Sequence, residues 1–353
     1  MKVIIVFANY FPELGGIQTY VDAFGGDKTT WYSDPTSQAA YRDYITTLVN
    51  RYRENCNVLA WELMNEPRCK SATNVPCDPN VVTDWANATS AWIKADQPEG
   101  LGDQNHLVSV GDEGWFHPNN LPIDADGSYP YTGAEGVDTV ALLDLPTIDF
   151  GTFHMYPDRC TFSCSLFSPI WLRARCLSLG FQHSSDLSAL TSNLLGSEED
   201  SWGATWINQH SDLAVEHNKP IILEEYGKEK ASGVRAAVVG AWQEAAVNSR
   251  KPPQTRTFSA IPTFMSQLLT LLLFESTGVA GDLYWEISLA FAARYTTGDD
   301  TAIYLNDTDY TQLVTDHAAA MAATSQDGEP SADIEPSENI EPSADVEPSP
   351  DDA

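Results

Sequence analysis

Six short apolar segments, rich in β-branched and aromatic residues, recur along the chain, and segments with helical periodicity separate them. The six segments are residues 3–7, 58–63, 106–110, 149–154, 220–223 and 282–285. They do not alternate apolar with polar residues as a strand with one exposed face does, so they predict a parallel sheet that is covered on both faces. Apolar residues at helical spacing in 41–52, 82–93 and 206–217 predict the covering helices, and the fold class is therefore α/β.

Polar residues gather where the predicted strands end, and their distribution distinguishes a closed barrel from an open doubly wound sheet. The strand-end residues are Asn65, Glu66, Asp112, Glu113, His154, Tyr156, Glu224, Glu225, Trp285 and Glu286. Functional groups at the carboxyl ends of many strands are typical of a barrel. A doubly wound sheet more often carries one glycine-rich phosphate loop, and the sequence contains no such motif. We therefore predict a (β/α)8 TIM barrel.

Six strands do not close an eight-stranded barrel, and the first predicted strand begins at Val3. The simplest interpretation is that two β/α units normally precede Met1 and are missing here, so that the barrel is incomplete. Such a barrel has two long strand edges without hydrogen-bond partners. We therefore expect the 353-residue chain to be insoluble or inactive as it stands.

The barrel is predicted to occupy residues 1–324, with two atypical segments inside it and a separate tail behind it. Residues 159–200 are rich in Cys, Ser, Leu and Arg without a clear period, and residues 250–276 carry the apolar run 268–274. Each segment is either a genuine loop above the active face or translated intron sequence, and we favour the second interpretation. Residues 325–353 repeat acidic Pro/Ser-rich hexads and predict a disordered tail.

The charge balance excludes two classes of partner. The chain has 50 acidic and 19 basic side chains, which gives a formal net charge of −31. Such a surface repels phosphate backbones and anionic lipids, so we expect neither a nucleic-acid nor a membrane partner. The longest apolar run is too short to span a bilayer. No signal peptide precedes the first strand.

Cys69 and Cys77 bracket a short polar loop and predict a disulfide if the protein is exported. A zinc site is the alternative, but the sequence has no paired C-x-x-C or H-x-x-x-H spacing to support it. Sequons that begin at Asn87 and Asn306 are compatible with secretion, although they also occur by chance. Together these features weakly favour an extracellular protein.

Carboxylates at two strand ends are candidates for chemistry. Glu66 follows a buried strand, where a charge is costly unless it is paired or used; a salt bridge to Arg68 is the structural alternative. Because neighbours on a strand point to opposite faces, we expect only one of Glu224 and Glu225 to face the barrel. The other is expected to pair with a Lys or Arg behind the sheet. Two carboxyls on separate strand ends can flank a glycosidic bond, one as proton donor and one as nucleophile.

Three further residues at strand ends suit the same chemistry. His154 and Tyr156 lie on one face of a strand and can tune the nucleophile by hydrogen bonding and charge, although a core histidine is the alternative for His154. Trp285 can stack against a sugar ring, and its alternative is a tryptophan of the barrel core.

The order and spacing of these motifs resembles the fungal endo-β-1,4-mannanases of glycoside hydrolase family 5. The matching motifs are Asn-Glu-Pro-Arg-Cys at 65–69, Gly-Asp-Glu-Gly at 111–114, Phe-His-Met-Tyr-Pro at 153–157, Glu-Tyr-Gly at 225–227 and Tyr-Trp at 284–285. The resemblance extends from about residue 2 to residue 322, apart from the two atypical segments. The family is contiguous across both of those positions, which is why we favour intron sequence there.

The resemblance implies a retaining barrel enzyme that hydrolyses β-1,4-mannosidic linkages in plant cell-wall mannan, galactomannan and glucomannan. It implies that Glu66 is the acid/base and that Glu225 is the nucleophile; the preference for Glu225 over Glu224 comes from the family's Glu-aromatic-Gly pattern. The residues implied to contact or orient the substrate are Asn65, Arg68, Trp115, His154, Tyr156 and Trp285. The resemblance implies no cofactor, no metal, a monomer and a secreted protein.

The chain also departs from the family. The family places an arginine near the nucleophile on its second strand, and this chain has no such strand. An endo-β-1,4-glucanase of the same family is one alternative, because the choice between mannose and glucose depends on how the site meets the axial 2-hydroxyl. A catalytically defective carbohydrate-binding barrel is the other, because strands are missing and two segments interrupt the barrel. A retaining pair predicts carboxyls roughly 5–5.5 Å apart, against roughly 6.5–9.5 Å for an inverting pair. We expect Glu66 to lie in the less polar surroundings, so that it keeps its proton while Glu225 stays ionised.

Overall fold

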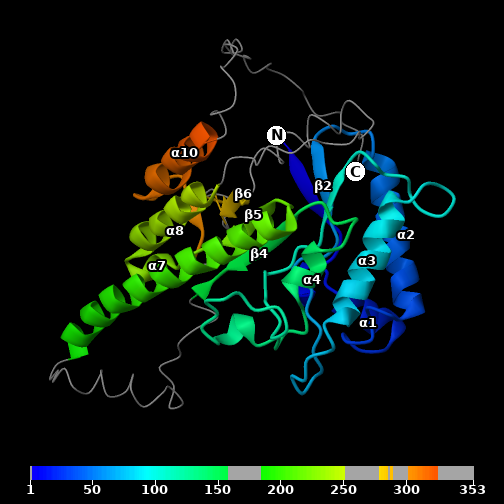
Figure 1. Ribbon diagram of the computed structural model, residues 1–353, viewed down its shortest axis with the longest axis horizontal. Helices are drawn as coiled ribbons and strands as arrows, with labels where there is room; N and C mark the ends of the chain where they lie inside the picture. Colours follow the sequence, from blue (N-terminus) through cyan, green and yellow to red (C-terminus); the bar gives the residue numbers. More distant parts are fainter. Residues whose placement is uncertain (1, 158–183, 251–277, 285–286, 289–300, 325–353) are drawn as a thin grey trace, which may run out of the picture.

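The computed structural model describes residues 2–157, 184–250, 278–284, 287–288 and 301–324, with residues 184–200 and 287–288 described by their backbone (Figure 1). All six predicted strands form, with boundaries that differ from the predicted ones by a few residues. The strands are β1 (Val3–Val6), β2 (Val58–Glu62), β3 (Leu107–Ser109), β4 (Gly151–Met155), β5 (Ile221–Tyr226) and β6 (Val279–Tyr284). A short parallel pair, β7 (Ile287–Ser288) and β8 (Ile303–Tyr304), follows them.

The six strands are parallel and lie side by side in chain order. One sheet has the order β1-β2-β3 and the other the order β4-β5-β6. Backbone hydrogen bonds connect the two sheets, because Asp149 N donates to Val108 O at 2.8 Å and His154 N donates to Glu113 O at 3.1 Å. This order is that of a (β/α) barrel, whereas a doubly wound sheet reverses its strand order at a switch point.

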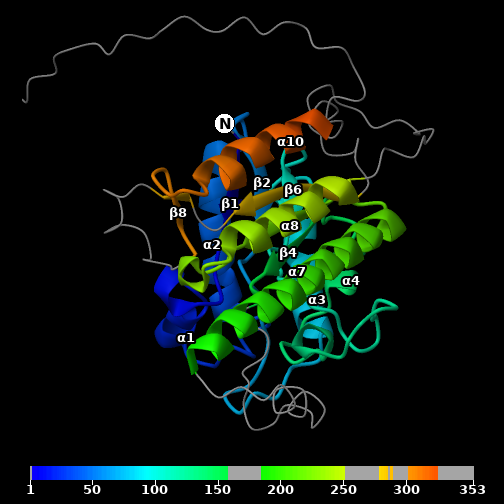
Figure 2. The same cartoon turned by 90° about the vertical axis from the view of Figure 1, so that its left-hand side faces the viewer.

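Helices cover the outside of the strands. They are α1 (Gln18–Phe24), α2 (Pro35–Tyr52), α3 (Asn80–Lys94), α4 (Thr139–Leu143), α7 (Ser184–His217), α8 (Arg235–Ser249) and α10 (His317–Thr324), with short 3-10 turns at Pro12–Leu14, Tyr129–Tyr131 and Lys230–Ser232 and a π-helix at Thr311–Asp316. Helices α2 and α3 lie beside the first sheet, and α7, α8 and α10 lie beside the second (Figures 1 and 2). The three helices predicted from periodicity are α2, α3 and α7.

Local sequence explains where these helices begin and which face they bury. Asp34 caps α2 by accepting a hydrogen bond from Ser37 N at 2.7 Å, and a proline follows it at the first helical position. The apolar stripe of α2, which includes Tyr41, Ile45 and Val49, is fully buried in a cluster with Trp61 of β2. Burying these side chains against the strands contributes most of the stability of such a helix.

The predicted disulfide forms between Cys69 and Cys77, whose Cα atoms lie 5.3 Å apart. The bond closes the loop that follows Arg68, and Cys69 N donates to Glu135 O at 2.8 Å. Among the described cysteines, Cys56 is free and exposed. No helix in the described part of the chain combines the length and the apolar character needed to cross a bilayer.

Parts of the domain predictions fall outside the described residues. Of the segment 159–200, residues 184–200 form the first half of α7, although their sequence has no clear period. Residues 159–183, 251–276 and the tail 325–353 lie outside the described residues, as does Trp285. The division at residue 324, the intron interpretation and the missing first two units stay predictions.

Candidate active site

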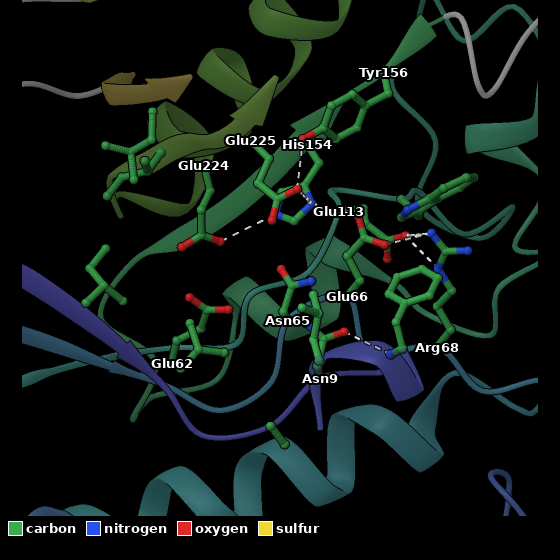
Figure 3. Close-up of a pocket in the computed structure, with 18 of the residues that line it drawn as sticks. Asn9, Glu62, Asn65, Glu66, Arg68, Glu113, His154, Tyr156, Glu224 and Glu225 are labelled. Carbon is green, nitrogen blue, oxygen red and sulfur yellow. Dashed lines mark hydrogen bonds and ion pairs between the residues drawn. The ribbon is translucent and has the colours of Figure 1, made fainter. Parts of the chain in front are cut away.

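A pocket of about 1510 Å³ opens at the carboxyl ends of the strands and continues along their inner face. Figure 3 shows that three carboxylates lie around His154 of β4, namely those of Glu66, Glu224 and Glu225. Glu113, which follows β3, contacts Arg68 instead. The acidic residues that line it include Glu62, Glu66, Glu113, Glu135, Glu224 and Glu225. Strand ends that lie far apart in the sequence therefore supply one acidic site.

Glu66 lies just beyond the end of β2, in a strained backbone conformation. Its φ angle is +50°, a left-handed value that residues other than glycine adopt rarely, and its N–H donates to Gly111 O at 2.8 Å. Such strain persists only where neighbouring contacts enforce it, and it is frequent at active sites. Its carboxylate contacts His154 Nδ1 at 3.0 Å through Oε1 and Arg68 Nη2 at 2.9 Å through Oε2. The predicted Arg68 salt bridge therefore exists alongside a second contact.

A β-bulge in β5 places both Glu224 and Glu225 in the pocket. Phe153 of β4 pairs with Leu223, but the next residue, His154, pairs with Glu225, so Glu224 is the extra residue. Leu223 packs in the core beneath the helices, as Tyr226 does, whereas the two glutamates between them line the pocket. The expectation that one glutamate would pair with a Lys or Arg behind the sheet is wrong. The bulge interrupts the strand alternation on which it rested.

His154 is the residue that the surrounding carboxylates share. Its Nδ1 lies 3.0 Å from Glu66 Oε1 and 3.6 Å from Glu225 Oε2, and its Nε2 lies 3.5 Å from Glu224 Oε2. Trp206 of α7 donates from Nε1 to the His154 carbonyl at 3.0 Å, which anchors this end of β4 to the helix layer. Tyr156 donates its hydroxyl to Glu225 Oε2 at 2.9 Å. Both residues that were expected to orient the nucleophile therefore contact Glu225.

The two candidate catalytic carboxyls are close together. One oxygen of Glu66, one of Glu225 and a ring nitrogen of His154 all lie within 4.8 Å of one another. This spacing favours direct attack by one carboxylate, because an inverting pair needs room for a water molecule between carboxyls roughly 6.5–9.5 Å apart. The spacing of the Glu66 and Glu225 carboxyls is thus compatible with a retaining pair.

The pKa values of the two carboxyls have the reverse of the expected order. Burial raises the pKa of Glu66, but the hydrogen bond and charge of His154 and the charge of Arg68 outweigh burial and hold that pKa below its ordinary value. Burial raises the pKa of Glu225, and the charge of His154 and the hydroxyl of Tyr156 only partly offset it. The expectation that Glu66 has the less polar surroundings is therefore wrong for the free site, because Arg68 contacts Glu66 and not Glu225.

The carboxylates around His154 favour its protonated form. Burial lowers its pKa, but the charge of Glu225 and the hydrogen bonds of Glu224 and Glu66 raise the pKa well above its ordinary value. Glu66, His154 and Glu225 have the spacing of three metal ligands. A protonated imidazole has no free lone pair, so a metal ion would have to displace the His154 proton to bind at these three residues.

Arg68 connects the site to a second group of buried acids. Its Nε donates to Glu113 Oε1 at 2.7 Å, and its Nη1 lies 3.8 Å from Glu135 Oε1. Lys70 Nζ contacts Glu135 Oε2 at 2.6 Å, and the Tyr129 hydroxyl donates to its Oε1 at 2.5 Å. One guanidinium is shared among several carboxylates, and burial together with the charge of Glu66 raises the pKa of Glu113 to about 8.

The remaining predicted site residues surround this group. Asn65 and Trp115 line the pocket, and the guanidinium of Arg68 lies over the rings of Trp115 at 5.9 Å and Phe11 at 5.2 Å. Aromatic faces beside polar groups are suited to binding sugar rings. Trp285 lies outside the described residues.

Sequence reasoning missed several residues of the pocket. Glu113 was named as a strand-end residue beside Asp112, but no role in the site was predicted for it. Glu62 lies inside a predicted strand, and a lone acid in an apolar run is a usable signal. Glu135 lies in a loop 67 positions beyond Arg68, and the bulge at Glu224 follows from pairing with β4. Local patterns do not predict either.

Comparison with known proteins gives a consistent result. Residues 1–255 match the family model described as cellulase (glycosyl hydrolase family 5). The chain is 35% identical over 327 residues to mannan endo-1,4-beta-mannosidase A of Aspergillus aculeatus, covering 92% of this chain and 65% of that protein. It is also 35% identical over 324 residues to a probable mannan endo-1,4-beta-mannosidase A of Aspergillus niger, of which it covers 63%. The chain thus spans less than two thirds of the length of these curated relatives.

Solved structures show the same likeness. The endo-1,4-beta-mannanase of Rhizomucor miehei superposes with a TM-score of 0.62 at 28% identity, over 92% of this chain and 72% of that one. The endo-beta-1,4-mannanase of Thermotoga petrophila superposes with a TM-score of 0.66 at 27% identity, over 94% of this chain and 60% of that one. These neighbours imply a (β/α)8 TIM-barrel fold.

Proposed function

Because the chain belongs to glycosyl hydrolase family 5, we propose that it hydrolyses internal β-1,4-mannosidic linkages of mannan, galactomannan and glucomannan with retention of configuration. The observation that carries the proposal is the proximity of Glu66, His154 and Glu225. One carboxylate oxygen of each glutamate and a ring nitrogen of His154 lie within 4.8 Å of one another. The names of the relatives from Aspergillus aculeatus and Rhizomucor miehei support mannan as the substrate.

In the proposed mechanism, Glu66 donates its proton to the glycosidic oxygen while Glu225 attacks the anomeric carbon. The bond to the leaving sugar breaks, and an ester between Glu225 and the mannosyl group forms. Glu66, now ionised, takes a proton from water as that water attacks the ester and releases Glu225. The Tyr156 hydroxyl stabilises the carboxylate form of Glu225, to which it donates.

The reaction requires its proton on Glu66, whereas the free site favours ionised Glu66 and protonated Glu225. In our proposal, substrate binding moves the proton to Glu66, because the glycosidic oxygen accepts a hydrogen bond from protonated Glu66. The assignment of the two roles follows the family's Glu-aromatic-Gly pattern at 225–227. It needs a test that separates nucleophile from acid/base.

Plant cell-wall mannan is the proposed partner, and secretion is the proposed localisation. The Cys69–Cys77 disulfide supports an oxidising compartment, and the sequon residues Asn87 and Asn306 are exposed. A monomeric state and the absence of cofactors stay predictions.

A substrate panel tests the activity. An active preparation should release reducing sugar from galactomannan and glucomannan and little from carboxymethylcellulose, and Glu225→Gln should abolish this release. An insoluble or inactive chain would instead match the expectation for an incomplete barrel. Cleavage of carboxymethylcellulose but not mannan would instead identify an endo-β-1,4-glucanase. Retention on a mannan affinity gel without any product would identify a carbohydrate-binding barrel without activity.

Azide rescue tests the two roles on a mannobioside with a dinitrophenyl leaving group. Such a leaving group needs no proton, so Glu66→Ala still forms the glycosyl ester, and azide converts that ester into a β-mannosyl azide. In Glu225→Ala, azide replaces the nucleophile and yields an α-mannosyl azide. The opposite pairing of variant and product would reverse the roles of the two residues.

A further inference from the structure

Two acidic residues lie deeper in the pocket than the catalytic pair and have no role in the mechanism above. Glu224 extends from the bulge of β5 towards the Nε2 side of His154, and Glu62 of β2 faces Glu224 (Figure 3). The Glu224 side chain is 9% exposed, and Glu62 as a residue is 2% exposed. A buried carboxylate is costly unless its neighbours compensate for lost hydration, so this arrangement calls for a physical explanation.

Glu62 is held in place by the backbone around it. A Cβ atom added at Gly111, where φ is +87°, would lie 2.2 Å from Glu62 Oε1 and 2.5 Å from Met64 O. Glycine at 111 thus leaves just enough space for this carboxyl. Burial, together with the charge and hydrogen bond of Glu224, raises the pKa of Glu62 well above its ordinary value. Burial and the charge of Glu224 thus favour the protonated form of Glu62, which has a proton to donate towards Glu224.

We propose that Glu224 is a positioning residue, which holds the imidazole of His154 from the Nε2 side so that Nδ1 stays between Glu66 and Glu225, and that Glu62 in turn holds Glu224. The effect of Glu224 on the reaction rate rests on the proposed function, but the contact between Glu224 and His154 does not. The bulge is what makes the arrangement possible, since it puts two consecutive glutamates on the same face of β5.

Both ring nitrogens of His154 then face carboxylates, and the ring cannot rotate without losing a contact. Nδ1 lies within 3.6 Å of both catalytic carboxyls, so its position and charge act on both. The titratable groups that face His154 from the surrounding strand ends are Glu62, Glu66, Asp112, Glu113, Glu224 and Glu225. Of these, Glu224 contacts Nε2, at 3.5 Å.

The direct test is a titration of the His154 imidazole by nitrogen-15 NMR, which needs no turnover. Glu224→Gln removes the negative charge but keeps the size of the side chain, so the midpoint of His154 should fall by about one pH unit or more. Glu229→Gln is the matched control: Glu229 is exposed on the loop after the same strand, and its loss should leave the midpoint unchanged. An equal midpoint in wild type and Glu224→Gln would overturn the proposal.

Two further variants separate charge from shape. Glu62→Gln keeps a hydrogen-bond donor towards Glu224, so it should move the His154 midpoint far less than Glu224→Gln does. Glu224→Asp keeps the charge, so it should recover part of the shift. A midpoint that falls equally in all three variants would indicate a general disruption of the pocket and would also overturn the proposal.

Kinetics connect the contact to the reaction. In Glu224→Gln, kcat on a mannooligosaccharide should fall by up to about 10²-fold with little change in KM, because a misplaced Nδ1 disturbs both carboxyls. The alkaline limb of the pH profile should move to lower pH with the His154 midpoint. If the midpoint shifts but the wild type has no activity, the positioning contact stands and the proposed function fails. If the wild type is active and Glu224→Gln leaves kcat and the profile unchanged, the positioning proposal fails.

Discussion

Glu66 and Glu225 differ in the charge and distance of the groups that contact them. Glu66 contacts Arg68 and His154 at 2.9 and 3.0 Å, whereas the shortest polar contact of the Glu225 carboxylate is the Tyr156 hydroxyl at 2.9 Å. This difference, and not the depth of burial, sets the order of their pKa values. The ionised form of Glu225, which the proposed mechanism requires, is favoured by the charge of His154 and by the hydroxyl of Tyr156.

Tyr156→Phe removes that hydroxyl while the ring stays. We expect kcat to fall by about 10²-fold, as is typical when one donor to a developing or attacking oxyanion is lost. The hydrogen bond lowers the pKa of Glu225, so its loss raises this pKa, and the acidic limb of the kcat/KM profile should move to higher pH. Profiles measured from pH 3.5 to 8 test both effects. Tyr52→Phe on α2 is the control, and equal profiles for the two variants would contradict the prediction.

At the level of elements, the helix layer behind β4 and β5 keeps the strand ends in register. Trp206 of α7 bonds to the backbone at His154, and α7 packs closely on α8 through Gly203 and the fully buried Trp242. Small residues allow two helices to approach, and a rigid ring fills the contact. The site is therefore sensitive to changes at the α7–α8 contact.

Gly203→Ala tests this packing. The added Cβ would lie 2.2 Å from Trp242 Nε1 and 2.5 Å from its Cδ1, and a buried indole ring cannot move away easily. We expect the free energy of unfolding to fall by roughly 1–3 kcal/mol, despite the better helix propensity of alanine. The matched control is Gly240→Ala on α8, where the added Cβ would meet, among the described residues outside its own helix turn, the flexible end of Gln312 at 3.0 Å. That variant should gain up to about 1 kcal/mol. Urea unfolding measures both, and equal effects would show that the contact is not tight.

At the level of the whole molecule, the strands bring together many acids around few cations. Burial raises the pKa values of Glu62, Asp112 and Glu113, in the case of Asp112 to about 6. A carboxyl with a raised pKa binds its proton more tightly in the folded chain than in the unfolded one. Its contribution to stability is complete below the unfolded pKa and disappears as the pH rises through the folded pKa.

Stability should accordingly fall between about pH 4.5 and pH 8, where Glu113 is protonated in the folded chain and ionised in the unfolded one. Glu113→Gln removes this titration but keeps an oxygen for Arg68. The slope of unfolding free energy against pH should then become shallower, by at most about 1.4 kcal/mol per pH unit. Urea titrations at several pH values check this. An unchanged slope would mean that Glu113 is ionised in the folded chain.

The sequence alone determined where the main strands and helices form and that Cys69 and Cys77 are joined by a disulfide. Apolar periodicity predicts β1 to β6, α2, α3 and α7 because burial of a stripe or a strand leaves a local pattern in the residue order. The Cys69–Cys77 disulfide was predictable because only eight positions separate the two residues. Strand-end polarity placed Glu66, His154, Tyr156 and Glu225 at one edge for the same reason: parallel strands end on the same side.

Only the tertiary structure decided how these groups act on one another. The bulge that turns Glu224 inward depends on pairing between β4 and β5, which are separated by more than sixty residues of sequence. The low pKa of Glu66 and the raised pKa of Glu225 depend on which carboxyl Arg68 and His154 contact. Hydrogen bonds and charge interactions act over a few ångströms in space whatever the separation along the chain, so residue order alone does not contain them.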